Sequence, residues 1–164
     1  MTEKEARVVG LGARQRVHGR PESTAGLAEA GSSLGWLYLA GAITRQLYES
    51  GNRFAEDVWA YHALTGIPHP SPRAIDYGRV RGLGRDSSPE AVKRATNRYM
   101  NVLGLIQQND RAGRPVETTL RNVVLLDMDA GNWPPHMIKM LRRVLEVLAG
   151  WYGIPADEPK VGAA

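Results

Sequence analysis

Apolar side chains recur at spacings of three and four residues along several stretches of the chain, a pattern typical of helices with one buried face. The clearest stripe lies in residues 44–64 and comprises Leu47, Gly51, Phe54, Val58 and Tyr61. Thr44 can cap the start of this segment. The run Gly66-Ile67-Pro68 can end it, because the residue before a proline avoids the α region. The pattern therefore predicts a helix over 44–64.

Four further segments predict helices: a short apolar run that Gly41 can end, over 33–41, and apolar stripes over 88–108, 118–130 and 132–153. The expected start signals are Ser32 or Ser33 for the first, Ser87-Ser88-Pro89-Glu90 for the second, Thr118 or Thr119 for the third and Asn132 for the fourth. Glu90 follows Ser87 by three residues, the spacing of a capping box. No convincing period-two segment is present, so the predicted fold class is all-α, with about five helices.

The 164 residues fit a single compact domain. Residues 1–31 mix charged residues, glycine and alanine without sustained periodicity, and we predict an irregular basic arm there. The helical domain is predicted over 32–154, followed by a tail over 155–164. Residues 68–86 contain several prolines, glycines and arginines, which predicts a long basic loop inside the domain.

The residue types needed for most catalytic and metal sites are missing or scattered. The chain has no cysteine, and its four histidines (His18, His62, His69 and His136) are far apart in sequence. The glycines in the run from Val8 to Gln15 do not complete a dinucleotide-binding turn. We therefore expect no enzyme activity, no metal and no cofactor. The lack of cysteine and of long apolar runs favours a cytoplasmic protein that does not enter the membrane.

Basic residues gather in three places, although the formal net charge is only +4. The candidate residues for binding nucleic acid or an acidic partner are Arg14, Arg16 and Arg20 in the arm; Arg79, Arg81, Arg85, Lys93, Arg94 and Arg98 in the loop and the helix after it; and Lys139, Arg142 and Arg143 in the last helix. Several cations on one surface can displace counterions from a phosphate backbone. The run His18-Gly19-Arg20-Pro21 also resembles the centre of an AT-hook.

Each cluster also has a simpler explanation. A turn accounts for the segment around Arg20, and solvated helix faces account for the other two clusters. Glu56 and Asp57 are neighbours that point about 100° apart on a helix, so we interpret them as part of a solvated face rather than an acid/base pair. Arg45, Glu49 and Arg53 are expected to form a surface ladder of charges four residues apart.

Two blocks of sequence resemble a bacterial domain family of unassigned biochemistry, which often forms the C-terminal part of helix-turn-helix regulators, including activators of gene transfer agents. The first block is Ser33-Leu34-Gly35-Trp36-Leu37 with Gly41, Ile43, Gln46, Ser50-Gly51, Arg53 and Asp57. The second is Trp133-Pro134 with Lys139, Leu141, Leu145, Leu148 and Tyr152-Gly153. The resemblance covers about residues 32–154. The chain departs from the family's usual residues at His136, Met137 and Trp151.

The resemblance implies a phage-like or prophage-derived transcriptional regulator that binds DNA, a subunit of RNA polymerase or a phage-like regulatory partner. Family members fused to a regulator carry a helix-turn-helix upstream, whereas this sequence has only the 31-residue arm before the helical domain. A different function class also fits a small basic helical chain: a phage packaging or structural adaptor, such as a small terminase subunit, which would form a homo-oligomeric ring.

Overall fold

The computed structural model describes residues 27–70, 88–110 and 115–157. All regular secondary structure in these three ranges is helical, which confirms the predicted all-α class. A short 3-10 helix, η1 (Ala28–Gly31), leads into five α-helices. In chain order these are α3 (Ser33–Leu39), α4 (Arg45–Thr65), α6 (Pro89–Asn109), α7 (Val116–Val124) and α8 (Pro135–Tyr152).

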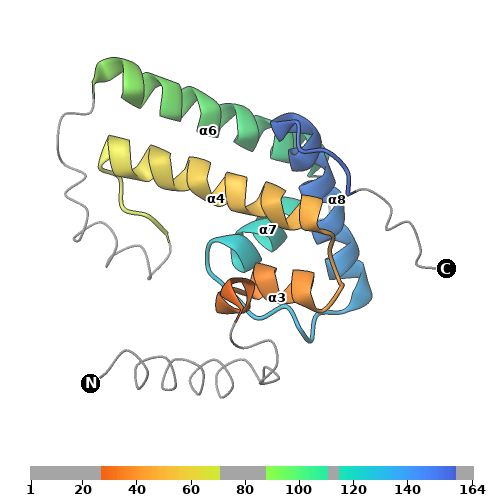
Figure 1. Ribbon diagram of the computed structural model, residues 1–164. Helices are drawn as coiled ribbons and strands as arrows, with labels where there is room; N and C mark the ends of the chain where they lie inside the picture. The colour runs from red at the N-terminus through yellow and green to blue at the C-terminus, as the bar shows by residue number, and fades with distance from the viewer. Residues whose placement is uncertain (1–26, 71–87, 111–114, 158–164) are drawn as a thin grey trace, which may run out of the picture.

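Helix α4 is the centre of the arrangement. It packs against α3, α6, α7 and α8, and its most extensive partners are α8 and α6 (Figure 1). Helices α4 and α6 lie side by side along most of their length, whereas α3 and α7 cover the other side of α4 (Figure 1). Helix α8 runs across the ends of both long helices and brings its last turn beside α6 (Figure 1).

The predicted apolar stripes form one core. In α4, Leu47, Phe54 and Val58 are buried, and Gly51 lies on the same face. The largest fully buried side chains outside α4 are Ile106 and Val102 of α6, Leu120 and Val123 of α7, and Leu141, Val144, Leu145 and Leu148 of α8. Fully burying a side chain such as leucine contributes about 1.5–3 kcal/mol, so the wide apolar face of α8 is a major source of stability.

Side-chain caps begin three of the helices where the sequence predicts them. The hydroxyls of Ser32, Thr44 and Ser88 accept hydrogen bonds from backbone N–H groups three residues later, at 3.0, 3.4 and 3.2 Å. At the other end, Gly66 closes α4 and Gly153 closes α8, with φ values of 72° and 64°. These left-handed conformations suit glycine, which has no Cβ to clash with the backbone.

Three predicted helix boundaries are wrong. Helix α7 begins at Val116 rather than near Thr118, because the Asp110 carboxylate accepts a hydrogen bond from the Val116 N–H at 2.6 Å. It ends at Val124, well before the predicted end at Ala130-Gly131. The chain turns soon after the helix, at Asp127, which has a positive φ of 54°. Helix α8 begins at Pro135 instead of following an Asn132 cap, and no side chain caps it.

Specific polar contacts fix the helices around α4. The Ser50 hydroxyl is buried and lies 3.0 Å from the Leu145 carbonyl of α8. At the start of α3, the Ser33 N–H donates to the Asp127 carboxylate at 2.6 Å, and the Ser33 hydroxyl donates to the Asp127 carbonyl at 3.0 Å. These bonds tie the α7–α8 connection to the beginning of the helical body.

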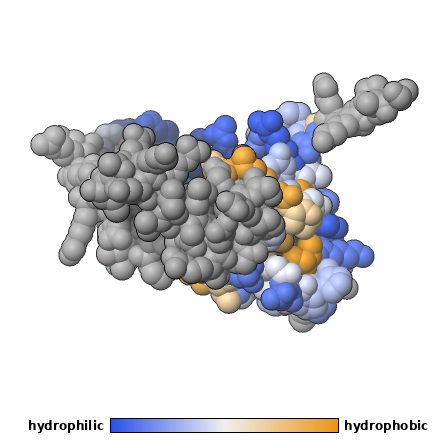
Figure 2. Space-filling model, turned by 60° about the horizontal axis from the view of Figure 1, so that its bottom comes forward, coloured by the Kyte–Doolittle hydropathy of each residue, from blue (hydrophilic) through white to orange (hydrophobic). Residues whose placement is uncertain are grey.

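The described surface is mixed in character. On the described part of the face shown in Figure 2, hydrophobic residues lie in small groups among hydrophilic ones. The large hydrophobic side chains that are most exposed are Leu27, Ile67, Met100, Leu126, Met128 and Trp151, each between 41% and 49% exposed. None of the described helices is both long enough and apolar enough to cross a membrane.

Candidate nucleic-acid interface

One face of α6 carries two arginines and two asparagines. Asn97, Arg98 and Asn101 follow Arg94 by three, four and seven residues. All four residues therefore lie along one side of the helix. They line a groove of about 730 Å³, which we call the arginine groove. Its lining residues are Arg53, Glu56, Asp57 and Ala60 from α4, Arg94, Asn97, Arg98 and Asn101 from α6, and Trp151 and Tyr152 from α8.

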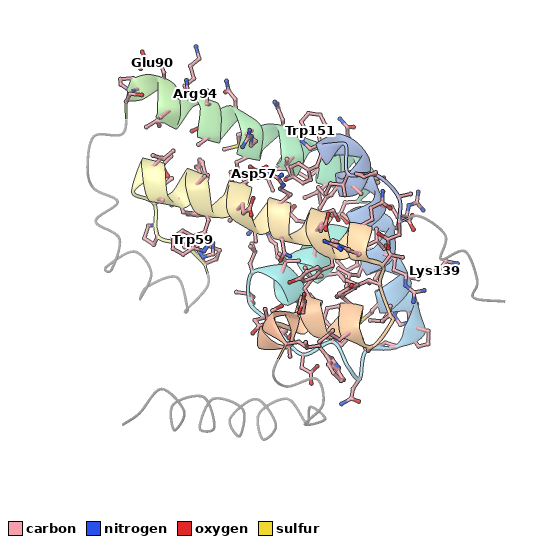
Figure 3. All side chains as sticks on the ribbon, viewed as in Figure 1. Asp57, Trp59, Glu90, Arg94, Lys139 and Trp151 are labelled. Carbon is pink, nitrogen blue, oxygen red and sulfur yellow. The ribbon has the colours of Figure 1, made fainter. Side chains whose placement is uncertain are left out.

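The arginine groove continues toward the N-terminal end of α6. A second hollow of about 420 Å³ shares Asp57, Ala60, Arg94 and Arg98 with it and reaches the small side chain of Ala91. Figure 3 shows Arg94 near the start of α6, Asp57 on the neighbouring α4 and Trp151 at the far end of α6, where α8 ends. The basic residues of α6 therefore face an elongated depression rather than a protruding ridge.

A third guanidinium group reaches the groove from α4. The side chain of Arg53 is 65% exposed, and its nearest carboxylate is that of Glu56, one turn later, at 3.8 Å. The predicted ladder is thus only partly present, because Glu49 pairs with Arg45 at 2.8 Å and not with Arg53. Exposed pairs of this kind contribute roughly 0–1 kcal/mol, so Arg53 can exchange Glu56 for an external anion at little cost.

Asp57 is the anchor of the groove, and our interpretation of it as part of a solvated face is wrong. Only 5% of the residue is exposed. The Tyr152 hydroxyl donates to one carboxylate oxygen at 2.7 Å, and an Arg98 guanidinium nitrogen lies 3.3 Å from the other. Asp57 follows Phe54 by three residues, which turns it inward on the core side of α4.

This network holds Arg98 in place while leaving most of it accessible. The Arg98 side chain is 68% exposed, although its partner Asp57 is almost completely enclosed. Burial raises the pKa of the Tyr152 phenol, and the hydrogen bond to the Asp57 carboxylate together with its negative charge raises it further. Tyr152 therefore stays protonated and continues to donate to Asp57. The second oxygen of Asp57 remains directed at Arg98.

Trp151 differs from the position expected for it. The sequence places it on the apolar face of the last helix, but 49% of the residue is exposed, and it forms one wall of the arginine groove. The buried stripe of α8 ends with Leu148 and Ala149, and in the last turn Tyr152 still packs against the core while Trp151 does not. Figure 3 shows Trp151 beside the C-terminal half of α6.

The predicted cations of the last helix form a second basic surface. Lys139, Arg142 and Arg143 line a hollow of about 760 Å³ beside α8 together with His136 and Glu146, and we call the three cations the α8 basic patch. All three are exposed. Arg142 also has a structural contact, because its Nε donates to the Ala42 carbonyl in the α3–α4 connection at 2.6 Å.

The structure thus divides the predicted binding residues into separate groups. Arg94 and Arg98 meet in the arginine groove, and Lys93 is exposed next to them on α6. Lys139, Arg142 and Arg143 lie on another part of the molecule, and Figure 3 shows Lys139 far from Arg94. The remaining six candidates, Arg14, Arg16, Arg20, Arg79, Arg81 and Arg85, lie outside the described residues.

A cluster of rings lies where the C-terminal half of α4 meets α6. Tyr61 stacks on Tyr99 with ring centroids 4.5 Å apart, and His69 packs against Trp59 and His62 at 5.6 and 5.1 Å. Burial, followed by the nearby charges of His62 and Arg121, lowers the pKa of His69 to about 4. His69 is therefore neutral at pH 7 and adds nothing to the basic surface.

Sequence reasoning missed Arg53, Asn97, Asn101, Trp151 and Tyr152 as groove residues. Asn97 and Asn101 had a usable signal, since they alternate with Arg94 and Arg98 on one helical face. Trp151 and Tyr152 had none, because only the crossing of α8 over α6 brings them to the groove.

No family model, curated protein or solved structure matches the chain. The resemblance described above therefore stays a prediction that depends on its two sequence blocks. The residues of those blocks lie mainly in α3, α4 and α8, and many of them are core positions such as Leu34, Leu141 and Leu145.

Proposed function

We propose that the chain is a non-enzymatic regulatory protein that binds nucleic acid through the arginine groove. One observation carries the proposal: guanidinium groups from two helices, those of Arg53 on α4 and of Arg94 and Arg98 on α6, line a single groove. Arginine is well suited to phosphate, because its planar fork of N–H donors can bind two oxygens at once.

The charges in the groove are compatible with an anionic ligand. Arg94 is exposed and pairs with no carboxylate within the described residues. The carboxylate of Asp57 is turned inward, where Tyr152 and Arg98 already bind it. Glu56 is the one exposed carboxylate among the lining residues, and it lies near Arg53 at 3.8 Å.

The regulatory role is supported by the resemblance, which implies a transcriptional regulator in a phage-like or gene-transfer-agent setting. The α8 basic patch would then serve as an auxiliary surface, touching a more distant part of the same polyanion or a subunit of RNA polymerase. Electrostatic attraction from both surfaces would speed the encounter with a negatively charged partner.

Binding across a salt series tests the proposal. We expect the logarithm of the affinity for a labelled DNA to fall linearly with the logarithm of salt concentration, by roughly 0.9 for each phosphate neutralised on a duplex and roughly 0.7 on a single strand. Arg94→Glu should reduce both affinity and slope. The free energy of unfolding should stay within about 0.5 kcal/mol of the unmodified protein, because the side chain is exposed. Arg98 is a poorer target, since its removal would leave a buried carboxylate without its cation.

Arg45→Glu is the matched control, because it makes the same charge change at an exposed position outside the groove. Equal losses from Arg94→Glu and Arg45→Glu would indicate a general charge effect and contradict the groove as the binding surface. An affinity that does not respond to salt would contradict nucleic-acid binding itself. Recovery of a polymerase subunit from lysate after nuclease treatment would indicate that the chain acts by binding a protein rather than nucleic acid.

The adaptor alternative retains one supporting observation. Leu126 and Met128, which flank Asp127 in the α7–α8 connection, are 41% and 47% exposed. Exposed apolar side chains of this size are common at surfaces where copies of a chain associate. The oligomeric state distinguishes the two functions, as discussed below.

A further inference from the structure

The arginine groove contains more than cations, and its other residues restrict the kind of nucleic acid that fits. A surface that only neutralises phosphate needs mobile lysines and arginines. Here the same groove also has an exposed indole at one end and two side-chain amides between the indole and Arg94. The indole suits the face of a base, and the amides can hydrogen-bond to the edge of a base as well as to a phosphate.

The indole is the first of these groups. Trp151 is 49% exposed at the end of α8, beyond the buried stripe that holds the helix to the core. An exposed aromatic ring next to guanidinium groups provides a flat apolar surface on which a nucleobase can stack. Stacking requires access to the face of the base, and in a duplex that face is covered by the neighbouring base pairs.

The amides are the second group. Asn97 and Asn101 are one turn apart on α6 and both are exposed. An asparagine amide offers a donor and an acceptor together, and it can therefore pair with the polar edge of an unpaired base. Arg94 and Arg98 alternate with the two asparagines along the same face. Cations and amides thus alternate in order along α6, so groups that can bind phosphate and groups that can bind a base lie beside each other in the groove.

The third feature is the link between Arg98 and the end of α8. Asp57 binds the hydroxyl of Tyr152 at 2.7 Å and lies 3.3 Å from the Arg98 guanidinium. Tyr152 is the immediate neighbour of Trp151, so one buried carboxylate fixes the end of α8 and the position of Arg98 together. The positions of the Trp151 ring and of the Arg98 guanidinium relative to each other are therefore fixed before any ligand binds. This fixed arrangement lowers the entropy cost of binding.

We propose that the arginine groove binds a single-stranded segment of nucleic acid, with a base stacked on Trp151 and the backbone phosphates on Arg94, Arg98 and Arg53. This inference rests on the proposed nucleic-acid-binding function and specifies the form of the ligand. A duplex fits the groove less well for two reasons. The faces of its bases are covered by neighbouring base pairs. In addition, the cations lie in a depression, whereas reading a major groove requires a helix that projects from the protein surface.

The test compares a fluorescent thymidine oligomer of about twelve nucleotides with a hairpin duplex of similar charge, by fluorescence anisotropy at one salt concentration. The unmodified protein should bind the single strand more tightly. Trp151→Ala should weaken single-strand binding by roughly 5- to 150-fold, the range found when a stacking residue is truncated. Trp151→Phe should retain most of the affinity, because a phenyl ring still stacks. Duplex binding should change little in either variant.

Met128→Ala is the control, because Met128 is 47% exposed but lies outside the groove. It should leave both affinities unchanged. A uridine oligomer of the same length identifies the source of the strand: tighter binding than the thymidine oligomer assigns RNA, and the reverse assigns DNA. Either result supports a single-stranded ligand.

Three results would overturn the inference. Trp151→Ala and the unmodified protein could bind the single strand equally, the duplex could bind as tightly as the single strand, or polyglutamate could compete as well as the oligomer. The last result would assign an acidic peptide instead. If duplex binding persists with its salt dependence and sensitivity to Arg94→Glu, only the inference fails. If the protein binds neither nucleic acid, the proposed function fails with it.

Discussion

Position 35 has no room for a side chain. Gly35 lies in the first turn of α3, and a Cβ there would collide with the backbone carbonyl of Glu29 in η1. Backbone atoms cannot move aside as a flexible side-chain end can. The close approach of η1 to α3 therefore depends on this glycine, which also belongs to the first sequence block of the family resemblance.

Substituting two glycines tests this packing. Gly35→Ala should lower the free energy of unfolding by about 1–3 kcal/mol through overpacking. Gly104→Ala should raise it by about 0.5–1 kcal/mol, because Gly104 lies inside α6 with open space around its Cβ position, and alanine is the better helix former. Urea denaturation of both variants gives the two values. A stable Gly35→Ala protein would show that η1 does not approach α3 as described.

Asp57 shows where prediction from sequence fails at the scale of a residue. Its position on α4 follows from local periodicity, but its burial depends on partners 41 and 95 residues away, Arg98 and Tyr152. A charged group is stable inside a fold only when such partners bind it. No pattern around Asp57 reveals that they are there.

At the scale of the element, the predictability of a helix end also depends on how near in sequence its hydrogen-bond partner lies. The starts of α3 and α4 were predictable because each cap lies three residues from the N–H that it binds. The start of α7 was not, since its acceptor, Asp110, lies six residues before Val116 and across a turn. Apolar periodicity predicted the longer helices α4, α6 and α8, because that signal repeats over several turns and does not depend on one contact, whereas α3 was predicted from a short apolar run between a serine cap and a glycine stop.

Helix α4 receives a second cap from the other end of the chain. The Asp157 carboxylate accepts hydrogen bonds from the backbone N–H groups of Arg45 and Gln46, at 2.9 and 3.1 Å. The Gln46 amide in turn donates to the Ile154 carbonyl at 2.7 Å. A negative group at the start of a helix satisfies free donors and interacts favourably with the helix dipole.

Removing this cap should weaken the protein measurably. Asp157→Ala should lower the free energy of unfolding by about 0.5–2 kcal/mol, the usual cost of losing an N-cap. Asp129→Ala is the control, since among the residues that the structure describes its carboxylate accepts a hydrogen bond only from the nearby Gly131 N–H, at 2.9 Å. Chemical denaturation of the two variants should separate them, and equal stabilities would mean that Asp157 does not cap α4 in solution.

The molecule as a whole is organised around α4, which touches every other α-helix in the described residues. The all-α class followed from the sequence, because the helical periods need only a common buried face. The arginine groove did not, because α6 and the end of α8 must first be placed against α4. Charge clusters along the chain pointed to Arg94 and Arg98 but could not show that the α8 basic patch lies elsewhere.

Particle mass separates the two functions at this scale. A regulator that binds one strand in one groove should be a monomer or dimer, whereas a packaging adaptor should form a large ring of defined size. We expect light scattering to give a mass of one or two chains across a tenfold range of protein concentration. A single larger species would favour the adaptor and direct attention to the surface around Leu126 and Met128.

The carboxylate shared by Tyr152 and Arg98 also constrains how the protein can diverge. Losing either partner leaves Asp57 enclosed and undercompensated, and losing Asp57 releases Arg98 into solvent and frees the Tyr152 hydroxyl. Related chains are therefore expected to keep all three residues or to replace them together. In related chains that no longer use the groove, we expect Asp57, Arg98 and Tyr152 to be replaced together by apolar residues, while the residues of the helical core stay the same.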